Sequence, residues 1–290
     1  QDIKVNLTDG GYNFPVKILE RKEALNLNKY YQETKDKGIS KNLIFEHKFK
    51  SHLIFKKINE LINNKKILDI VENFIGPNIL CWNSIIFYKK KNSKTFVGWH
   101  EDKTYWNLNN DKIITFSIAL SNSKIENGCL KFLKKKREVD YEILKSKDNM
   151  LARGQNAILD DKDNYEHIEL NPGEACIFGQ DAVHGSGENQ SSEDRFLLAI
   201  RYISTDNKTK NNHTTATLVR GVDNYNYYEP EPIPEKDFDE KCVLFHQKLM
   251  AKQTEIFAKY KLKKFKLSFL SFMVRAPYIR YLYYWFNKKI

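Results

Sequence analysis

The sequence predicts a mostly β protein, an antiparallel double-sheet barrel with helices packed against its outside. Three observations predict this architecture: a helical start, a later series of short strands separated by turn residues, and enough apolar residues to fill a large core. The 290 residues are 41% hydrophobic and 13% aromatic, which is typical of globular proteins. This length allows one large domain or two ordinary ones.

Residues 1–75 form the predicted N-terminal helical region. Charged and apolar residues alternate at helical spacing in "IFKKINELINNKKILDIVENFIG", where Ile54, Ile58 and Ile62 fall on one face with lysines opposite. The Gly-Pro pair at 76–77 ends this pattern. We therefore expect a helical segment that packs on a β core.

Residues 76–232 form the predicted barrel core. Its clearest strands are 78–90, 112–121 and 195–203, rich in β-branched and aromatic residues. The second strand alternates an apolar face with a small polar face that includes Thr115 and Ser117, which suits the lining of a ligand cavity. The lysine run "YKKKNSK" (88–94) is expected at a solvated hairpin end. Attraction of an anionic substrate is the alternative, because the run precedes the stretch with His100 and Asp102.

Residues 233–290 are predicted to form a helical extension, with a helix over about 236–263 and then a basic, aromatic tail. The net charge of +11 is uneven: residues 261–290 hold eight Lys or Arg and no Asp or Glu, which leaves +3 for the rest. A nearly balanced body does not indicate a nucleic-acid partner. The four cysteines are widely spaced without a CxxC motif, which favours a reducing, cytoplasmic setting.

Three roles stay open for the tail at 261–290: lying on an anionic membrane, docking a partner protein, or packing on the barrel. Pro277 and scattered polar residues interrupt any membrane span. Because the chain opens on Gln1, a targeting segment before it is neither shown nor excluded. The sequence leaves the oligomeric state open.

A candidate metal site begins in the stretch "VGWHEDKTYW", which holds His100 and Asp102. On a strand, residues two apart point to the same face. Non-haem Fe(II) oxygenases use two imidazoles and one carboxylate, and leave coordination positions for a co-substrate and O₂. The pair alone is a weak signal in a chain with seven histidines. His184, where a strand runs into a polar loop, is the expected third ligand.

Arg195 is the candidate anchor for an acidic co-substrate, because it lies eleven residues after His184 and opens the strand at 195–203. Its planar guanidinium suits a bidentate grip on the far carboxylate of 2-oxoglutarate. Arg201, farther along the same strand, is the competing candidate. The remaining histidines lack partners at a ligand spacing and are expected on the surface or in the core: His47, His52, His167, His213 and His246.

Several segments together resemble the phytanoyl-CoA dioxygenase (PhyH) family of Fe(II)- and 2-oxoglutarate-dependent oxygenases. They are, in order, "WHEDKTYW", "SNSKIENGCLKFL", "LARGQ", "LNPGEACIFGQDAVHGSGENQSSEDRFLLAIRY" and "TLVRGVDNYNYYEPEP". The resemblance covers roughly residues 76–232 and implies a double-stranded β-helix, the jelly-roll or cupin-like core. It also implies that His100, Asp102 and His184 hold iron and that Arg195 and Ser186 contact 2-oxoglutarate.

One departure from the family pattern is Glu101, where the family more often has Gln. Its side chain is expected to point away from the metal. The carboxylate of Asp102 favours hydroxylation, because halogenating relatives have a small residue there.

The implied activity is a dioxygenase that uses Fe(II), 2-oxoglutarate and O₂ to hydroxylate an unactivated C–H bond. The late segment and "KTYW" look most like members that act on small polar molecules, quaternary-ammonium or phosphonate compounds. Thr104, Tyr105 and Trp106 are the candidate substrate contacts, with the aromatic pair offering a cation–π wall; packing of the barrel wall is the alternative. Two other functions stay open: a hydroxylase of lipid or CoA-linked substrates at a membrane, and a metal-binding jelly roll without oxygenase activity.

Overall fold

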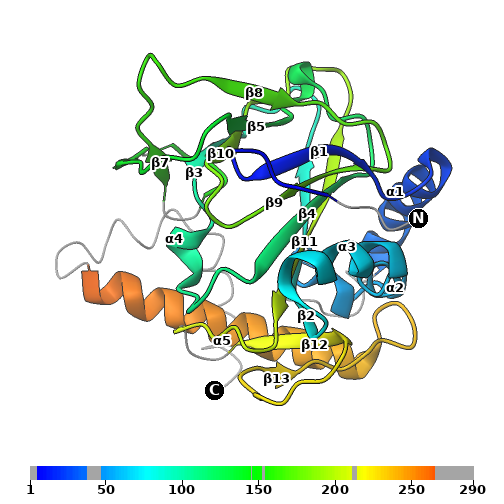
Figure 1. Cartoon of the computed structure of the whole chain (residues 1–290). Helices are drawn as coiled ribbons and strands as arrows, with labels where there is room; N and C mark the ends of the chain where they lie inside the picture. Colours follow the sequence, from blue (N-terminus) through cyan, green and yellow to red (C-terminus); the bar gives the residue numbers. More distant parts are fainter. Residues whose placement is uncertain (1–4, 38–46, 145, 152–153, 211–213, 265–290) are drawn as a thin grey trace, which may run out of the picture.

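Two antiparallel sheets pack against each other, and helices cover the outer face of the larger one (Figure 1). The computed structural model describes residues 5–37, 47–144, 146–151, 154–210 and 214–264. Strands outnumber helices, which confirms the predicted mostly β class. The two facing sheets confirm the predicted jelly-roll core.

The larger sheet has seven strands in the order β1-β9-β4-β11-β2-β12-β13. Their bounds are β1 Tyr12–Lys17, β9 Glu174–Phe178, β4 Ile113–Ala119, β11 Arg195–Ser204, β2 Ile79–Lys89, β12 Thr215–Arg220 and β13 Glu229–Pro230. Neighbouring strands run antiparallel except β12 and β13, which are parallel. The predicted strands at 78–90, 112–121 and 195–203 are thus confirmed as β2, β4 and β11.

The smaller sheet has four strands in the order β3-β10-β5-β8, with bounds β3 Val97–His100, β10 His184–Ser186, β5 Leu130–Leu133 and β8 Tyr165–Ile168. A separate two-stranded sheet joins β6 (Tyr141–Ile143) to β7 (Gln155–Ala157). The expected loop at His184 is instead the start of β10, because this segment pairs with both β3 and β5.

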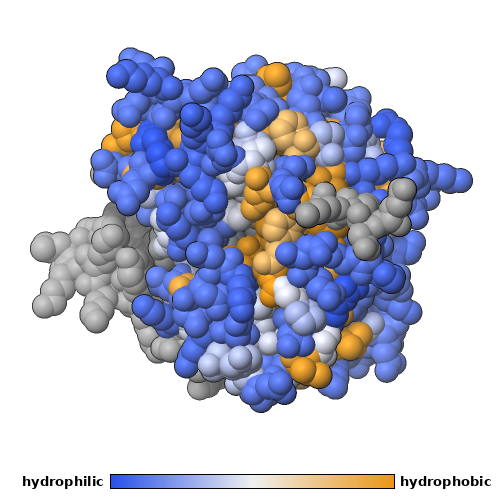
Figure 2. Space-filling model, viewed as in Figure 1, coloured by the Kyte–Doolittle hydropathy of each residue, from blue (hydrophilic) through white to orange (hydrophobic). Residues whose placement is uncertain are grey.

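The helices lie mostly on the outer side of the larger sheet (Figure 1). Their bounds are α1 Arg21–Lys35, α2 Lys56–Ile62, α3 Lys65–Ile75, α4 Lys103–Trp106 and α5 Glu240–Lys264, with short 3₁₀ turns η2 Ser51–Leu53 and η3 Ile125–Asn127. The main hydrophobic core lies where α1, α2 and α3 pack on β4 and β11. The face in Figure 2 is mostly hydrophilic, with hydrophobic atoms gathered in a central band.

The two faces of β4 meet different environments, as its alternating sequence predicts. Ile114, Phe116 and Ile118 belong to the core under the helices. Ala119 belongs to a second cluster, together with Phe132 of the smaller sheet. The face that carries Thr115, Ser117 and Ala119 therefore points between the two sheets.

The helical prediction for residues 1–75 is wrong in one place, because Tyr12–Lys17 is the edge strand β1. It pairs with β9, about 160 residues later in the chain, so its partner could not be read locally. Pro15, which has no N–H to donate, is tolerated at an edge strand where the register shifts. The predicted boundary at residue 75 thus cuts β1 from the sheet to which it belongs.

The expected helix before Gly76 is two helices, α2 and α3, which meet at Asn63 and Asn64. The Asn64 side chain accepts a hydrogen bond from the backbone N–H of Ile67 at 3.3 Å and caps the second helix. The predicted C-terminal helix is confirmed as α5.

The basic, aromatic tail lies outside the described residues except for its first turn in α5, and so does His213. In the part of the chain that the structure describes, no helix is long and apolar enough to cross a membrane.

Candidate metal and co-substrate site

Two buried histidines face each other across neighbouring strands of the smaller sheet. His100 ends β3, His184 begins β10, and the two are register partners with ring centroids 4.2 Å apart. Each ring places Nδ1 2.9 Å from a backbone carbonyl two residues earlier, that of Gly98 for His100 and that of Ala182 for His184. A carbonyl only accepts, so Nδ1 carries a proton on both rings. Nε2 is then the ring nitrogen of each histidine that is available to a metal.

Asp102 completes a set of three potential metal ligands with His100 and His184, and these three residues form the metal group. One ligand atom from each of His100, Asp102 and His184 lies within 4.8 Å of the others, and all three residues are buried. This is the one such group of three or more among the described residues. The strand argument for the pair is wrong, because β3 ends at His100 and Asp102 is the N-cap of α4. The turn into that helix brings its carboxylate back beside the imidazoles.

The chemistry of this group fits a divalent metal. Asp102 Oδ2 receives no hydrogen bond from any described residue although the atom is buried. Burial opposes ionisation, but the charge of Arg201 and the neighbouring histidines hold the pKa of Asp102 well below its usual range. Burial and the charge of His100 lower the pKa of His184 to about 3. An ionised carboxylate and a neutral imidazole are the forms that bind Fe(II).

Arg195 and Lys89 form a buried pair of basic side chains that is linked to the strand of His184 through Ser186. They are register partners on β11 and β2, with exposed fractions of 2% and 0%. The Arg195 Nη1 donates to the carbonyl of Gly128, and its Nε has no hydrogen-bond partner. No described carboxylate forms an ion pair with either residue. Burial lowers the pKa of Lys89 to about 6 and that of Arg195 to about 10.

Ser186 connects this cation pair to the histidine strand. Its hydroxyl accepts a hydrogen bond of 2.8 Å from Lys89 Nζ, and Lys89 also donates to the carbonyl of Gly187. Ser186 lies two residues beyond His184 on β10. The predicted co-substrate residues, Arg195 and Ser186, are therefore joined through Lys89.

Lys89 is the residue that the sequence interpretation missed, because the run at 88–94 was expected to be solvated. One signal could have found it: Lys89 falls in phase with Phe87 and Ile85, which share its face of β2. A lysine that continues the inward face of a strand lies inside the barrel, unlike Lys90, which is exposed.

The segment "KTYW" forms α4, immediately after Asp102. Trp106 is buried, 5.7 Å from Trp82 between ring centroids, and the Arg201 guanidinium lies 5.0 Å above its ring. The Tyr105 ring meets that of His100 edge-on at 6.0 Å. The Thr104 hydroxyl donates to the carbonyl of Glu101.

Arg201 lies on the same face of β11 as Arg195, but it meets different partners. Its Nη2 is 3.5 Å from Asp102 Oδ2, and its Nε has no hydrogen-bond partner. It is buried, with an exposed fraction of 8%. The structure thus places one buried arginine beside Lys89 and the other beside the metal group.

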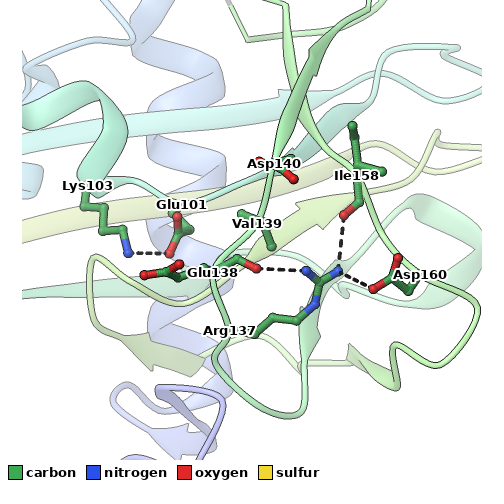
Figure 3. Close-up of a pocket in the computed structure, with 8 residues that line it drawn as sticks. All are labelled: Glu101, Lys103, Arg137, Glu138, Val139, Asp140, Ile158 and Asp160. Carbon is green, nitrogen blue, oxygen red and sulfur yellow. Dashed lines mark hydrogen bonds and ion pairs between the residues drawn. The ribbon is translucent and has the colours of Figure 1, made fainter.

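Glu101 points away from the metal group, as expected. Its carboxylate accepts from the Tyr141 hydroxyl at 3.0 Å and pairs with Lys103 at 2.7 Å. Figure 3 shows it in a polar pocket, where Lys103 pairs with Glu101 and Arg137 contacts Asp160 and two backbone carbonyls. The pocket is lined by Glu101, Lys103, Arg137, Glu138, Val139, Asp140, Ile158 and Asp160.

The other described histidines have local roles. His52 is fully buried and pairs with Glu231 at 2.8 Å, and His246 Nε2 lies 2.8 Å from the carbonyl of Phe49. His47 contacts the Tyr31 hydroxyl, and His167 lies beside Cys129. None of these four is in the three-residue group His100, Asp102 and His184 that the described residues form.

A jelly roll that holds two histidines and one carboxylate inside the barrel defines a class, the mononuclear non-haem iron oxygenases. The profile of the phytanoyl-CoA dioxygenase (PhyH) family matches residues 17–197. The chain belongs to this family, and it is an Fe(II)- and 2-oxoglutarate-dependent dioxygenase.

The proteins similar to the chain include two curated relatives and one solved structure. A probable alpha-ketoglutarate-dependent hypophosphite dioxygenase of Stutzerimonas stutzeri is 28% identical over 207 residues, which cover 70% of this chain and 68% of that protein. A methylphosphonate hydroxylase of Gimesia maris is 27% identical over 145 residues, 50% of this chain and 53% of that protein. The non-heme monooxygenase ThoJ, in its apo form, shares the fold at a TM-score of 0.75 and 24% identity, covering 87% of this chain and 96% of ThoJ.

Proposed function

We propose that the protein hydroxylates a small phosphonate-type compound, with iron held by His100, Asp102 and His184. Bound Fe(II) supplies the oxidising chemistry, in which 2-oxoglutarate and O₂ give succinate, CO₂ and an oxygen atom for the substrate. The protein's own contribution is to bind both organic molecules beside the metal and to exclude water there.

The observation that supports the 2-oxoglutarate site is a pair of buried basic side chains, Arg195 and Lys89, without a carboxylate partner among the described residues. A buried arginine is costly unless it is paired. Arg195 and Lys89 together match the far carboxylate of 2-oxoglutarate, and Ser186 holds Lys89 in place with a hydrogen bond. Arg195 is preferred to Arg201 for this role because Arg201 is already engaged beside Asp102.

The electrostatics of the substrate side favour an anion over a quaternary ammonium ion. The ring of Trp106, a candidate cation–π surface, already carries the Arg201 guanidinium at 5.0 Å. A cationic substrate next to it would meet a like charge in a poorly screened interior. The hypophosphite and methylphosphonate activities of the two relatives support the same choice, a small phosphorus oxyanion.

Succinate formation tests this proposal. The purified protein is supplied with Fe(II), 2-oxoglutarate and O₂, and then with one of four probes: methylphosphonate, choline, a fatty acid or an acyl-CoA. We expect methylphosphonate to stimulate succinate formation above the rate without a probe, and Arg195→Ala to remove the stimulated rate. Stimulation by choline, fatty acid or acyl-CoA but not by methylphosphonate would contradict the phosphonate substrate. Full turnover by Arg195→Ala would contradict the role of Arg195 in binding 2-oxoglutarate.

A further inference from the structure

Three polar side chains form a row across the centre of the larger sheet, on the face toward the smaller sheet. Arg201 of β11 is the register partner of Asn83 on β2 and of Thr115 on β4. Residues directly opposite on neighbouring strands have Cβ atoms about 5 Å apart. The row therefore presents three polar groups side by side in the barrel interior.

Each member of this row has a buried polar atom without a hydrogen bond. These atoms are Arg201 Nε, Asn83 Oδ1 and Thr115 Oγ1. Buried polar groups are nearly always paired, because leaving them unpaired costs free energy. Three unpaired atoms in one row indicate a site for a ligand that bonds to all of them.

The guanidinium of Arg201 is held in place for such a ligand. It lies over the Trp106 ring, and that ring packs edge-on against Trp82. Its Nη2 lies 3.5 Å from Asp102 Oδ2, so the row adjoins the metal group. A ligand bound at the row would lie next to the place where oxygen is transferred.

The positive charge of Arg201 has no compensating negative charge once Fe(II) and 2-oxoglutarate are bound. The charges of Fe(II), Asp102, 2-oxoglutarate and Arg195 cancel, and a protonated Lys89 would add further positive charge. Arg195 and Arg201 are six residues apart on one strand, about 20 Å between Cα atoms. Their head groups have different partners, the Gly128 carbonyl and the Trp106 ring, so one small diacid does not account for both.

We infer that Arg201, Thr115 and Asn83 form the substrate subsite, which recognises the singly protonated form of a phosphonic acid. This inference rests on the proposed function. Arg201 Nε and the Thr115 hydroxyl donate to the anionic oxygens, and Asn83 Oδ1 accepts from the P–OH group. A carboxylate lacks that hydroxyl, and the head group of a quaternary ammonium compound is a cation without acceptor oxygens.

The test has two parts. The first measures equilibrium binding of methylphosphonate, in the absence of O₂, to the protein loaded with Fe(II) and 2-oxoglutarate. The second measures the KM for methylphosphonate and kcat in the presence of O₂. Thr115→Val removes one hydroxyl at almost constant volume, and Arg201→Gln removes the charge. We expect the Kd of methylphosphonate to rise about fivefold in Thr115→Val and at least about tenfold in Arg201→Gln. Arg220→Gln is the matched control, because Arg220 pairs with Asp69 and Glu72 away from the site.

Other outcomes separate the alternatives. An unchanged methylphosphonate Kd in Thr115→Val and Arg201→Gln, with turnover intact, overturns the subsite and leaves the proposed function standing. A second result also overturns the substrate subsite: Arg201→Gln loses bound iron while Thr115→Val leaves the methylphosphonate Kd unchanged. Arg201 would then be a positioning residue for Asp102. Binding that depends on the row without succinate formation supports the subsite and contradicts the proposed function, and no binding by the unaltered protein contradicts both.

Discussion

Lys89 and Arg195 lie directly opposite each other on β2 and β11, both buried and without a carboxylate partner among the described residues. Two like charges at this spacing destabilise the sheet unless one of them is neutral or a ligand compensates them. Burial lowers the pKa of Lys89 to about 6, so in the free protein the repulsion is relieved by a neutral Lys89. A bound carboxylate would instead compensate the positive charges of both residues.

The affinity for 2-oxoglutarate should therefore depend on pH. Lys89 is mostly neutral above pH 6 in the free protein, and a carboxylate beside it raises its pKa, so binding takes up a proton. Proton uptake makes the affinity fall as pH rises, by up to about tenfold per pH unit. Measuring the Kd of 2-oxoglutarate for the iron-loaded protein between pH 6 and pH 9 checks this. Lys89→Met should bind more weakly at pH 6 and lose the slope; a slope that persists in Lys89→Met would assign it to another group.

Arg195→Gln should raise the KM for 2-oxoglutarate by about 10- to 100-fold, because it removes a charge-assisted pair in a buried site. The effect on the apparent affinity for methylphosphonate should be much smaller. Steady-state kinetics with each substrate varied in turn gives both constants. An equal loss for both substrates would point to a general disturbance of the barrel.

Asp102→Ala should weaken iron binding, since it removes the one charged ligand of the metal group and leaves the two imidazoles. A metal that binds only the folded state raises the midpoint of thermal unfolding. We expect a given Fe(II) concentration to raise Tm clearly in the unaltered protein and much less in Asp102→Ala. Glu101→Gln, one residue earlier and directed to the polar pocket that Lys103 and Arg137 line, should retain the shift. A full Tm shift in Asp102→Ala would remove Asp102 from the ligand set.

A second buried ion network should matter for stability and not for chemistry. Glu231 pairs with Lys50 and His52 and accepts from the hydroxyls of Thr215 and Thr217. Glu231→Gln leaves the Lys50 charge buried and uncompensated, which should lower the free energy of unfolding by about 3–5 kcal/mol. Urea titration measures this loss, with the exposed Glu229→Gln as the control. Equal stability of the two variants would contradict it.

The site could be predicted in part because its residues carry local signals. The spacing of His100, Asp102, His184 and Arg195 survives in the linear sequence, and the alternation in β4 marks which face of that strand points inward. The reason given for one pair was nevertheless wrong, because Asp102 reaches the metal group through the start of α4 and not along a strand.

By itself, the sequence predicted the fold class, three candidate metal ligands and the arginine that follows them. These predictions came from strand periodicity, from residue spacing and from the resemblance of short segments to the PhyH family. Only the tertiary structure decided that Lys89 lies opposite Arg195 and that Arg201 shares a row with Asn83 and Thr115. Strand register between segments about 100 residues apart is set by the packing of whole sheets, and a shift of one residue would turn each of these side chains to the other face.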